Sequence, residues 1–156
     1  MKNSMALLTK TLMVGAILLA CTPYMGCSSK IIPVSHDWVE KSSISVQKGD
    51  WVESMGWASM AISSDVTRWE PYVNRAWAFC ELGYYDKAIE DCNEALALNP
   101  ESSAAYNNRG LAYHRKGEVE KAKEDYEKAC SMGLEIACKN YTEITGERPP
   151  MLKGSK

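Results

Sequence analysis

Cysteine and histidine are the residue types in this chain that could take part in the widest range of reactions and metal binding. The chain has six cysteines and two histidines in 156 residues. A metal site needs such ligands in close pairs, but the sequence has no CxxC, and His36 and His114 stand alone. GxSxG, HExxH, CxxCH and phosphate-binding glycine loops are also absent from the sequence. We therefore expect no catalytic residue, no cofactor and no metal, and the chain is not predicted to be an enzyme.

The charged residues are balanced and scattered along the chain. The formal net charge is −2 and the pI is near 5.7, which argues against a nucleic-acid partner because such proteins carry a basic stripe. Asp86 and Asp91, like Glu124 and Asp125, are expected on solvated helix faces and not as catalytic carboxylate pairs.

The N-terminus predicts a signal peptide. Lys2 and Lys10 precede the apolar stretch 11–20, whose length is about half of what a membrane-spanning helix needs. The sequence that ends this stretch, Leu18-Leu19-Ala20-Cys21, resembles the lipobox of bacterial lipoproteins. In that family the peptide is cut before the cysteine, which is acylated. The resemblance implies that residues 1–20 are removed and that Cys21 carries lipid; an ordinary signal peptide with an unmodified Cys21 is the alternative.

The same resemblance implies a location. Two or three acyl chains anchor a protein stably, so residues 21–34 would form a lipidated tether to a membrane. Thr22, and no aspartate, follows the cysteine. In enterobacteria-like sorting this favours the outer membrane, so we expect the protein on the periplasmic face of the outer membrane in the bacterial envelope.

Two stretches of the chain match without a gap at a spacing of 34 residues. The matched pairs include Ala76 with Gly110, Phe79 with Tyr113, Gly83 with Gly117, Ala88 with Ala122 and Ala95 with Ala129. Apolar residues at spacings of three and four predict helices over about 71–82 and 85–98, with a break at Gly83. A fixed period of this length indicates a repeat solenoid built from helical hairpins, which presents a surface for binding other proteins.

The residues around these breaks resemble the tetratricopeptide repeat. Leu82-Gly83-Tyr84-Tyr85-Asp86-Lys87-Ala88-Ile89 is similar to the inter-helix turn of that family, and Ala95-Leu96-Ala97-Leu98-Asn99-Pro100 to its exit. The resemblance implies an all-α, right-handed α-solenoid of about three hairpins. The expected segments are a degenerate repeat at 35–68, repeats at 69–102 and 103–136, a capping helix at 137–146 and a disordered tail at 147–156.

The remaining cysteines would lie in an oxidising compartment. Cys130 and Cys138 resemble the cysteine pair of the Sel1-like repeat proteins, where that spacing bridges adjacent helices, and the resemblance implies a disulfide. Cys92 is expected as a buried thiol and Cys80 on a first helix towards the groove, with a Cys80–Cys92 bridge as the alternative. Cys27 on the tether could form an intermolecular bond.

The tetratricopeptide resemblance also implies a concave groove lined by the first helix of each hairpin. The groove residues expected from the repeat frame are Val73, Trp77, Glu81, Asn107, Leu111, His114 and Arg115, with Val39 and Ser43 in the first unit. Trp77 and Leu111 are candidate apolar anchors, while Asn107 and Arg115 could hold a peptide backbone or carboxylate. Packing of Trp77 on Leu111 remains the alternative for these two side chains.

Members of the family that hold the carboxylate of chaperone C-termini use a clamp of lysines and asparagines. Asn74 and Asn108 match that clamp, but Val39, Ser43 and Ala104 stand where its other polar residues should be. The sequence therefore argues against this ligand.

The function expected from these features is a lipid-anchored adaptor or scaffold that binds a protein or peptide partner in the bacterial envelope. Two other classes remain open at this point. One is a structural subunit of an envelope assembly or secretion complex that uses its convex face, and the other is a thiol or redox protein that works through Cys80 or Cys27.

Overall fold

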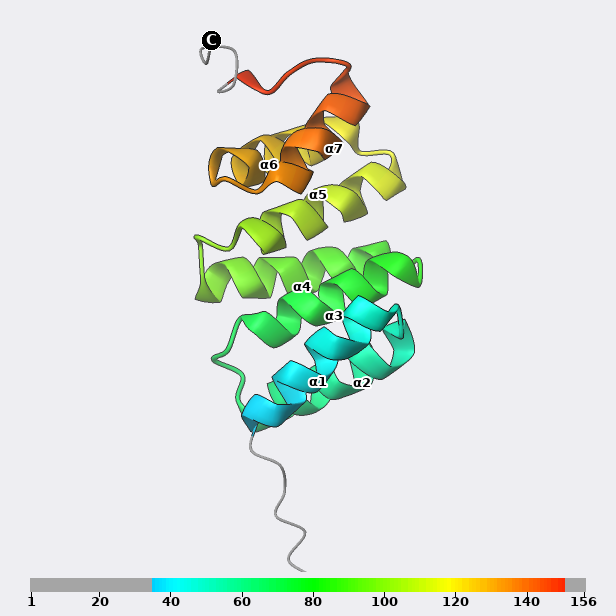
Figure 1. Ribbon diagram of the computed structural model, residues 1–156, viewed down its shortest axis with the longest axis vertical. Coiled ribbons are helices and arrows are strands. Elements are labelled where there is room, and N and C mark those ends of the chain that lie inside the picture. The colour runs from blue at the N-terminus through cyan, green and yellow to red at the C-terminus, as the bar shows by residue number, and fades with distance from the viewer. Residues whose placement is uncertain (1–34, 151–156) are drawn as a thin grey trace, which may run out of the picture. The chain divides into compact units, whose positions relative to one another are not determined.

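The computed structural model describes residues 35–150, which fold into seven α-helices with no strand among them. In chain order these are α1 (Ser35–Lys48), α2 (Trp51–Ser64), α3 (Glu70–Glu81), α4 (Tyr85–Leu98), α5 (Ser103–Lys116), α6 (Val119–Ser131) and α7 (Glu135–Thr145). Each helix packs against the next one in the chain (Figure 1). The prediction of an all-α stack of helical hairpins is confirmed. The expected signal peptide and the tether with Cys21 and Cys27 lie outside the described residues.

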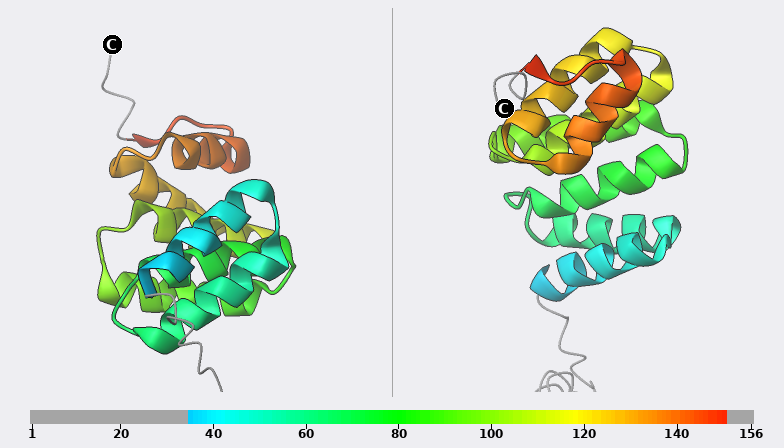
Figure 2. Two further views of the ribbon diagram at one scale, coloured as in Figure 1. Left: turned by 60° about the horizontal axis from the view of Figure 1, so that its bottom comes forward. Right: turned by 45° about the horizontal axis from the view of Figure 1, so that its top comes forward.

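The first helices of the three hairpins share one face of the stack. Besides their chain neighbours, α1 contacts α3, and α3 contacts α5 (Figure 2 gives two further views). This face is where the repeat frame places the groove. Among the described residues, no helix is both long and apolar enough to cross a lipid bilayer.

The turns inside the hairpins have one geometry, repeated with the sequence period. Gly83 and Gly117 have φ values of 83° and 84°, in the left-handed region that glycine adopts without steric strain. At the first of these turns the amides of Gly83 and Tyr84 donate to the carbonyls of Cys80 and Phe79. This pattern satisfies the carbonyls that a helix end leaves unpaired, so the break is encoded locally.

Small residues let the two helices of a hairpin approach closely. A Cβ atom at Gly110 would lie 2.9 Å from ring carbons of Tyr126 and 3.3 Å from the carbonyl oxygen of Ala122. One period earlier, Ala76 and Cys92 pack in one buried cluster at the equivalent positions. In the third hairpin the large side chain of Tyr126 on the second helix is therefore accommodated by glycine on the first helix. In the second hairpin the smaller Cys92 leaves room for alanine.

Two ion pairs repeat with the period and correct the expectation for two of the acidic residues. Arg75 forms two hydrogen bonds of 2.7 and 2.8 Å with Asp91, and Arg109 forms two of 2.8 Å with Asp125. Both aspartates are buried, not solvated as predicted, because each packs under the guanidinium of its own hairpin. Each arginine also bonds the second helix of the preceding hairpin, at Ser59 or Asn93, and so couples neighbouring hairpins.

The first hairpin replaces this ion pair with a different contact. Lys41 and Trp57 occupy the equivalent positions, and the Lys41 ammonium lies 4.7 Å from the centroid of the Trp57 ring. An exposed cation–π contact of this kind is weaker than a buried, bidentate ion pair. The divergence of this hairpin from the other two therefore extends to its side-chain contacts.

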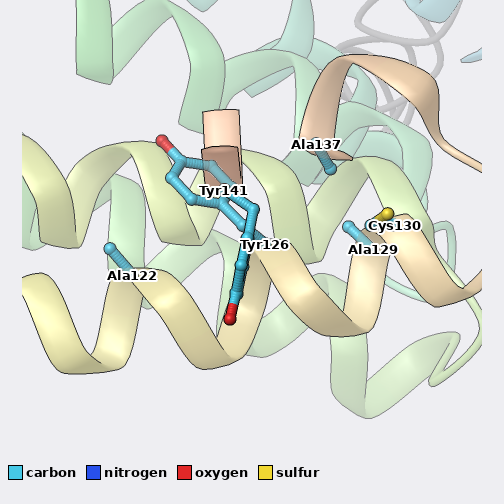
Figure 3. Packing of buried hydrophobic residues seen from close by; sticks show 6 residues of the cluster. All are labelled: Ala122, Tyr126, Ala129, Cys130, Ala137 and Tyr141. Carbon is cyan, nitrogen blue, oxygen red and sulfur yellow. The ribbon is translucent and has the colours of Figure 1, made fainter. Parts of the chain in front are cut away.

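The last helix covers the end of the stack. Ala137 and Tyr141 of α7 pack with Ala122, Tyr126 and Ala129 of α6 in one buried cluster (Figure 3). Helix α7 runs from Glu135 to Thr145. In the segment expected as a disordered tail, Pro149 is fully buried. Residues 151–156 lie outside the described part.

Candidate functional site

A groove with a volume of about 490 Å³ lies where α1, α3, α5 and α7 supply the lining side chains. The apolar lining residues are Val46, Val73, Trp77, Ala104, Leu111, Leu134 and Ile136. The polar ones are Ser43, Gln47, Asn74, Glu81, Asn107, Asn108 and Asn140. Its volume falls within the range of about 300–1,000 Å³ that is typical of ligand sites.

Five of the seven groove residues expected from the repeat frame line this groove, namely Val73, Trp77, Glu81, Asn107 and Leu111. Helical periodicity explains why they come together, since residues three or four apart share one face of a helix. His114 and Arg115 lie outside the lining, and Val39 is buried with Trp38 and Ala61 in the core of the first hairpin.

Arg115 is engaged by two partners on the preceding hairpin, of which Glu81 lines the groove. Its guanidinium lies 3.0 Å from the carboxylate of Glu81 and donates a hydrogen bond of 3.3 Å to the carbonyl of Cys80. The side chain expected to bind a ligand carboxylate is thus engaged within the protein. Its charge is used to neutralise Glu81.

Trp77 lies in the groove as expected and stacks on Trp51, a partner that the sequence did not suggest. Its side chain lines the groove together with Leu111 and is 41% exposed. Its ring also stacks on Trp51 at the start of α2, with ring centroids 6.2 Å apart and planes inclined by 27°. The stack fixes the orientation of a large, exposed apolar surface, which is the kind of anchor that protein interfaces use.

Carboxamides connect the helices along the groove. Asn74 donates to the hydroxyls of Ser42 and Ser43 at 2.6 and 2.9 Å. Asn108 donates to the carbonyl of Val73 at 3.3 Å. Asn140 on α7 donates to the side-chain oxygen of Asn107 at 3.0 Å.

The contribution of the segment between α6 and α7 was not expected from the sequence. Leu134 and Ile136 line the groove, and Ile136 is 50% exposed. The only sequence signal was Ile136 itself, an apolar residue outside the α7 positions expected to face the core. Cys130 and Cys138 form a disulfide that encloses both residues in a short loop. The bridge therefore ties this part of the groove to α6.

The two free thiols in the described residues, Cys80 and Cys92, are fully buried and do not form a disulfide. Burial raises the pKa of Cys80 to about 12 and that of Cys92 well above its usual value. The thiolate is the reactive form of cysteine, so the burial of the Cys80 thiol argues against the redox alternative at this residue. Cys27 lies outside the described residues. Residues 35–150 contain no group of three or more potential metal ligands.

Comparison with known families identifies the hairpins. A family model described as TPR repeat matches residues 77–117, and one described as tetratricopeptide repeat matches residues 103–132. Residues 77–132 of the chain thus match the tetratricopeptide repeat. TPR domains mediate protein–protein interactions.

Individual relatives agree with this assignment. The chain is 34% identical over 102 residues to RNA polymerase II-associated protein 3 of Xenopus tropicalis, covering 65% of this chain and 15% of that protein. The chain thus spans a small part of the curated relative that it matches.

Two of the solved structures that resemble this chain illustrate the similarity in fold. The first TPR domain of Spaghetti (RPAP3), bound to the HSP90 peptide SRMEEVD, has a TM-score of 0.67 at 27% identity, with 72% of this chain and 91% of that chain covered. MamA has a TM-score of 0.66 at 25% identity, with 75% of this chain and 70% of that chain covered.

Proposed function

We propose that this TPR protein is a lipid-anchored adaptor of the bacterial envelope that binds a peptide segment of a partner protein in its groove. The observation that supports binding most directly is the exposed Trp77 ring, held by Trp51 at the edge of the groove. The solved RPAP3 domain was bound to a peptide, and the proposal carries that mode of binding over to this chain.

The proposed anchor rests on the N-terminal sequence. The apolar stretch 11–20 is followed directly by Cys21, the residue that the lipobox resemblance implies is acylated. Acylation would place the groove close to a membrane surface, on the periplasmic face of the outer membrane. The adaptor would then recruit its partner to that surface.

Capture from the host envelope tests the binding role. The wild-type protein, Trp77→Ala and the control Ile44→Ala would be captured in parallel, and the co-purified proteins compared by mass spectrometry. Ile44 matches Trp77 in exposure, at 41%, but lies outside the groove lining. We expect partners that are lost with Trp77→Ala and retained with Ile44→Ala. Partners that persist in both variants would move the interface to the convex face and favour a structural subunit.

Metabolic labelling tests the anchor separately. Cells supplied with an alkyne-tagged fatty acid should incorporate the label into the wild-type protein and not into Cys21→Ser. The wild-type protein should also fractionate with membranes. Equal labelling of the two proteins, or an unlabelled wild type, would contradict acylation at Cys21.

A further inference from the structure

Charge is nearly absent from the groove, although 24% of the residues of the chain are charged. Among residues 35–150, Glu81 is the one charged side chain in the lining, and it is paired with Arg115. No lysine or arginine of this part of the chain lines the groove. A carboxylate of a ligand would lose water there without gaining a cation, and burial of an unpaired charge is strongly unfavourable.

The apolar lining comes from two parts of the fold. Val73, Trp77 and Leu111 lie on α3 and α5, whereas Leu134 and Ile136 lie before and on α7. Each apolar side chain of a ligand that these residues cover would contribute about 25 cal/mol per Å² of buried apolar surface. Binding in this groove is therefore driven by apolar ligand side chains.

The asparagines favour a ligand with free backbone groups. The nitrogens of Asn74 and Asn140 are used within the protein. A carboxamide oxygen accepts hydrogen bonds, so the side-chain oxygens of both residues offer acceptors to the backbone amides of a ligand. A helical ligand would already have used most of its backbone groups, whereas an extended segment exposes them.

We infer that the ligand of this groove is a short, extended peptide segment with uncharged, mainly apolar side chains. This inference rests on the proposed function and gives the groove a chemical preference. It separates this chain from the RPAP3 domain, whose bound peptide SRMEEVD has three acidic residues. An acidic segment would meet no cation free to pair with it, because Arg115 is already paired with Glu81.

A random dodecapeptide library displayed on phage tests the preference. The full chain, reconstituted into liposomes, would be used as bait in wild-type form and as Trp77→Ala, Ile136→Ser and the control Ile44→Ala. Trp77 and Ile136 are both substantially exposed, so these substitutions should preserve the fold, which circular dichroism would verify. Peptides retained by the wild type and Ile44→Ala but lost from the groove variants define the ligand class.

We expect those peptides to be rich in apolar residues and depleted in aspartate and glutamate relative to the library. Substituting two acidic residues into a selected peptide should weaken its binding about tenfold or more, a loss of about 1.4 kcal/mol. Groove-dependent peptides enriched in acidic residues would overturn the inferred ligand class and leave the groove as the binding site. If no retained peptide depends on Trp77 or Ile136, the proposed function itself fails.

Discussion

Replacing Gly110 by alanine should destabilise the protein, although alanine is the better helix former. Gly110 lies inside α5, where the change gains about 1 kcal/mol in helix propensity. The new Cβ atom would lie 2.9 Å from the Tyr126 ring and 3.3 Å from the backbone oxygen of Ala122. Tyr126 is fully buried and cannot move aside into solvent. Overpacking typically costs about 1–3 kcal/mol, and a contact this short with a buried ring places the cost at the upper end, so the propensity gain leaves a net loss of about 2 kcal/mol.

Gly56 provides the matched control for helix propensity. It lies inside α2, is exposed, and an added Cβ atom would meet nothing within 4 Å. Gly56→Ala should therefore raise the free energy of unfolding by about 1 kcal/mol, the propensity gain alone. Urea denaturation followed by circular dichroism measures both variants, with the slope in urea expected to stay constant.

A second substitution identifies the clash as the cause. Tyr126→Cys copies the preceding hairpin, where Cys92 packs with Ala76. In that background the ring is gone and only the 3.3 Å contact with the oxygen of Ala122 remains, so most of the destabilisation by Gly110→Ala should disappear. The same effect of Gly110→Ala in both backgrounds, or stabilisation equal to that of Gly56→Ala, would refute the argument from close packing.

Three further predictions follow from buried groups. Arg109→Ala leaves the carboxylate of Asp125, which is 5% exposed, without its cation. Burial already raises the pKa of this carboxyl, although the two hydrogen bonds from Arg109 lower it. The free energy of unfolding measured by urea denaturation should therefore fall by about 3–5 kcal/mol. A loss below about 1 kcal/mol, the value of an exposed pair, would argue against that role. Replacing both Cys130 and Cys138, eight positions apart, by serine should lower the same quantity by about 2–3 kcal/mol, and an unchanged urea midpoint would contradict the bridge. Cys80, whose pKa burial raises to about 12, should resist a thiol reagent at pH 8 until the protein is unfolded; fast labelling of the native protein would show that it is accessible.

Much of the fold is readable from the chain because its signals are local. The helix expected over 85–98 is α4 as observed, since Gly83 precedes it and Asn99-Pro100 follows it. The helix expected over about 71–82 is α3, which runs from Glu70 to Glu81. A left-handed turn and a proline act within a few residues of where they stand, so these boundaries need no knowledge of distant contacts.

The groove was predictable in part for the same reason. The repeat frame transfers a helix face from one hairpin to the next, and with it Val73, Trp77 and Asn107 reach the lining. The frame carries no information on where a long, flexible side chain points. Arg115 was predicted to line the groove but does not, because the direction of its side chain depends on Glu81 in another hairpin.

The sequence by itself determined the period, the hairpins, the small residues at the close approaches and the candidate lipid anchor, because each depends on a short pattern or on its repetition. Tertiary structure alone decided which charges are buried and what completes the groove. The sequence alone predicts that Asp91 and Asp125 face solvent. In the folded protein they are buried under the arginines sixteen positions earlier. Ile136 acquires its place in the groove because α7 packs on α6 and the disulfide holds the intervening turn. Such outcomes depend on which surfaces meet in space, and no local pattern specifies that.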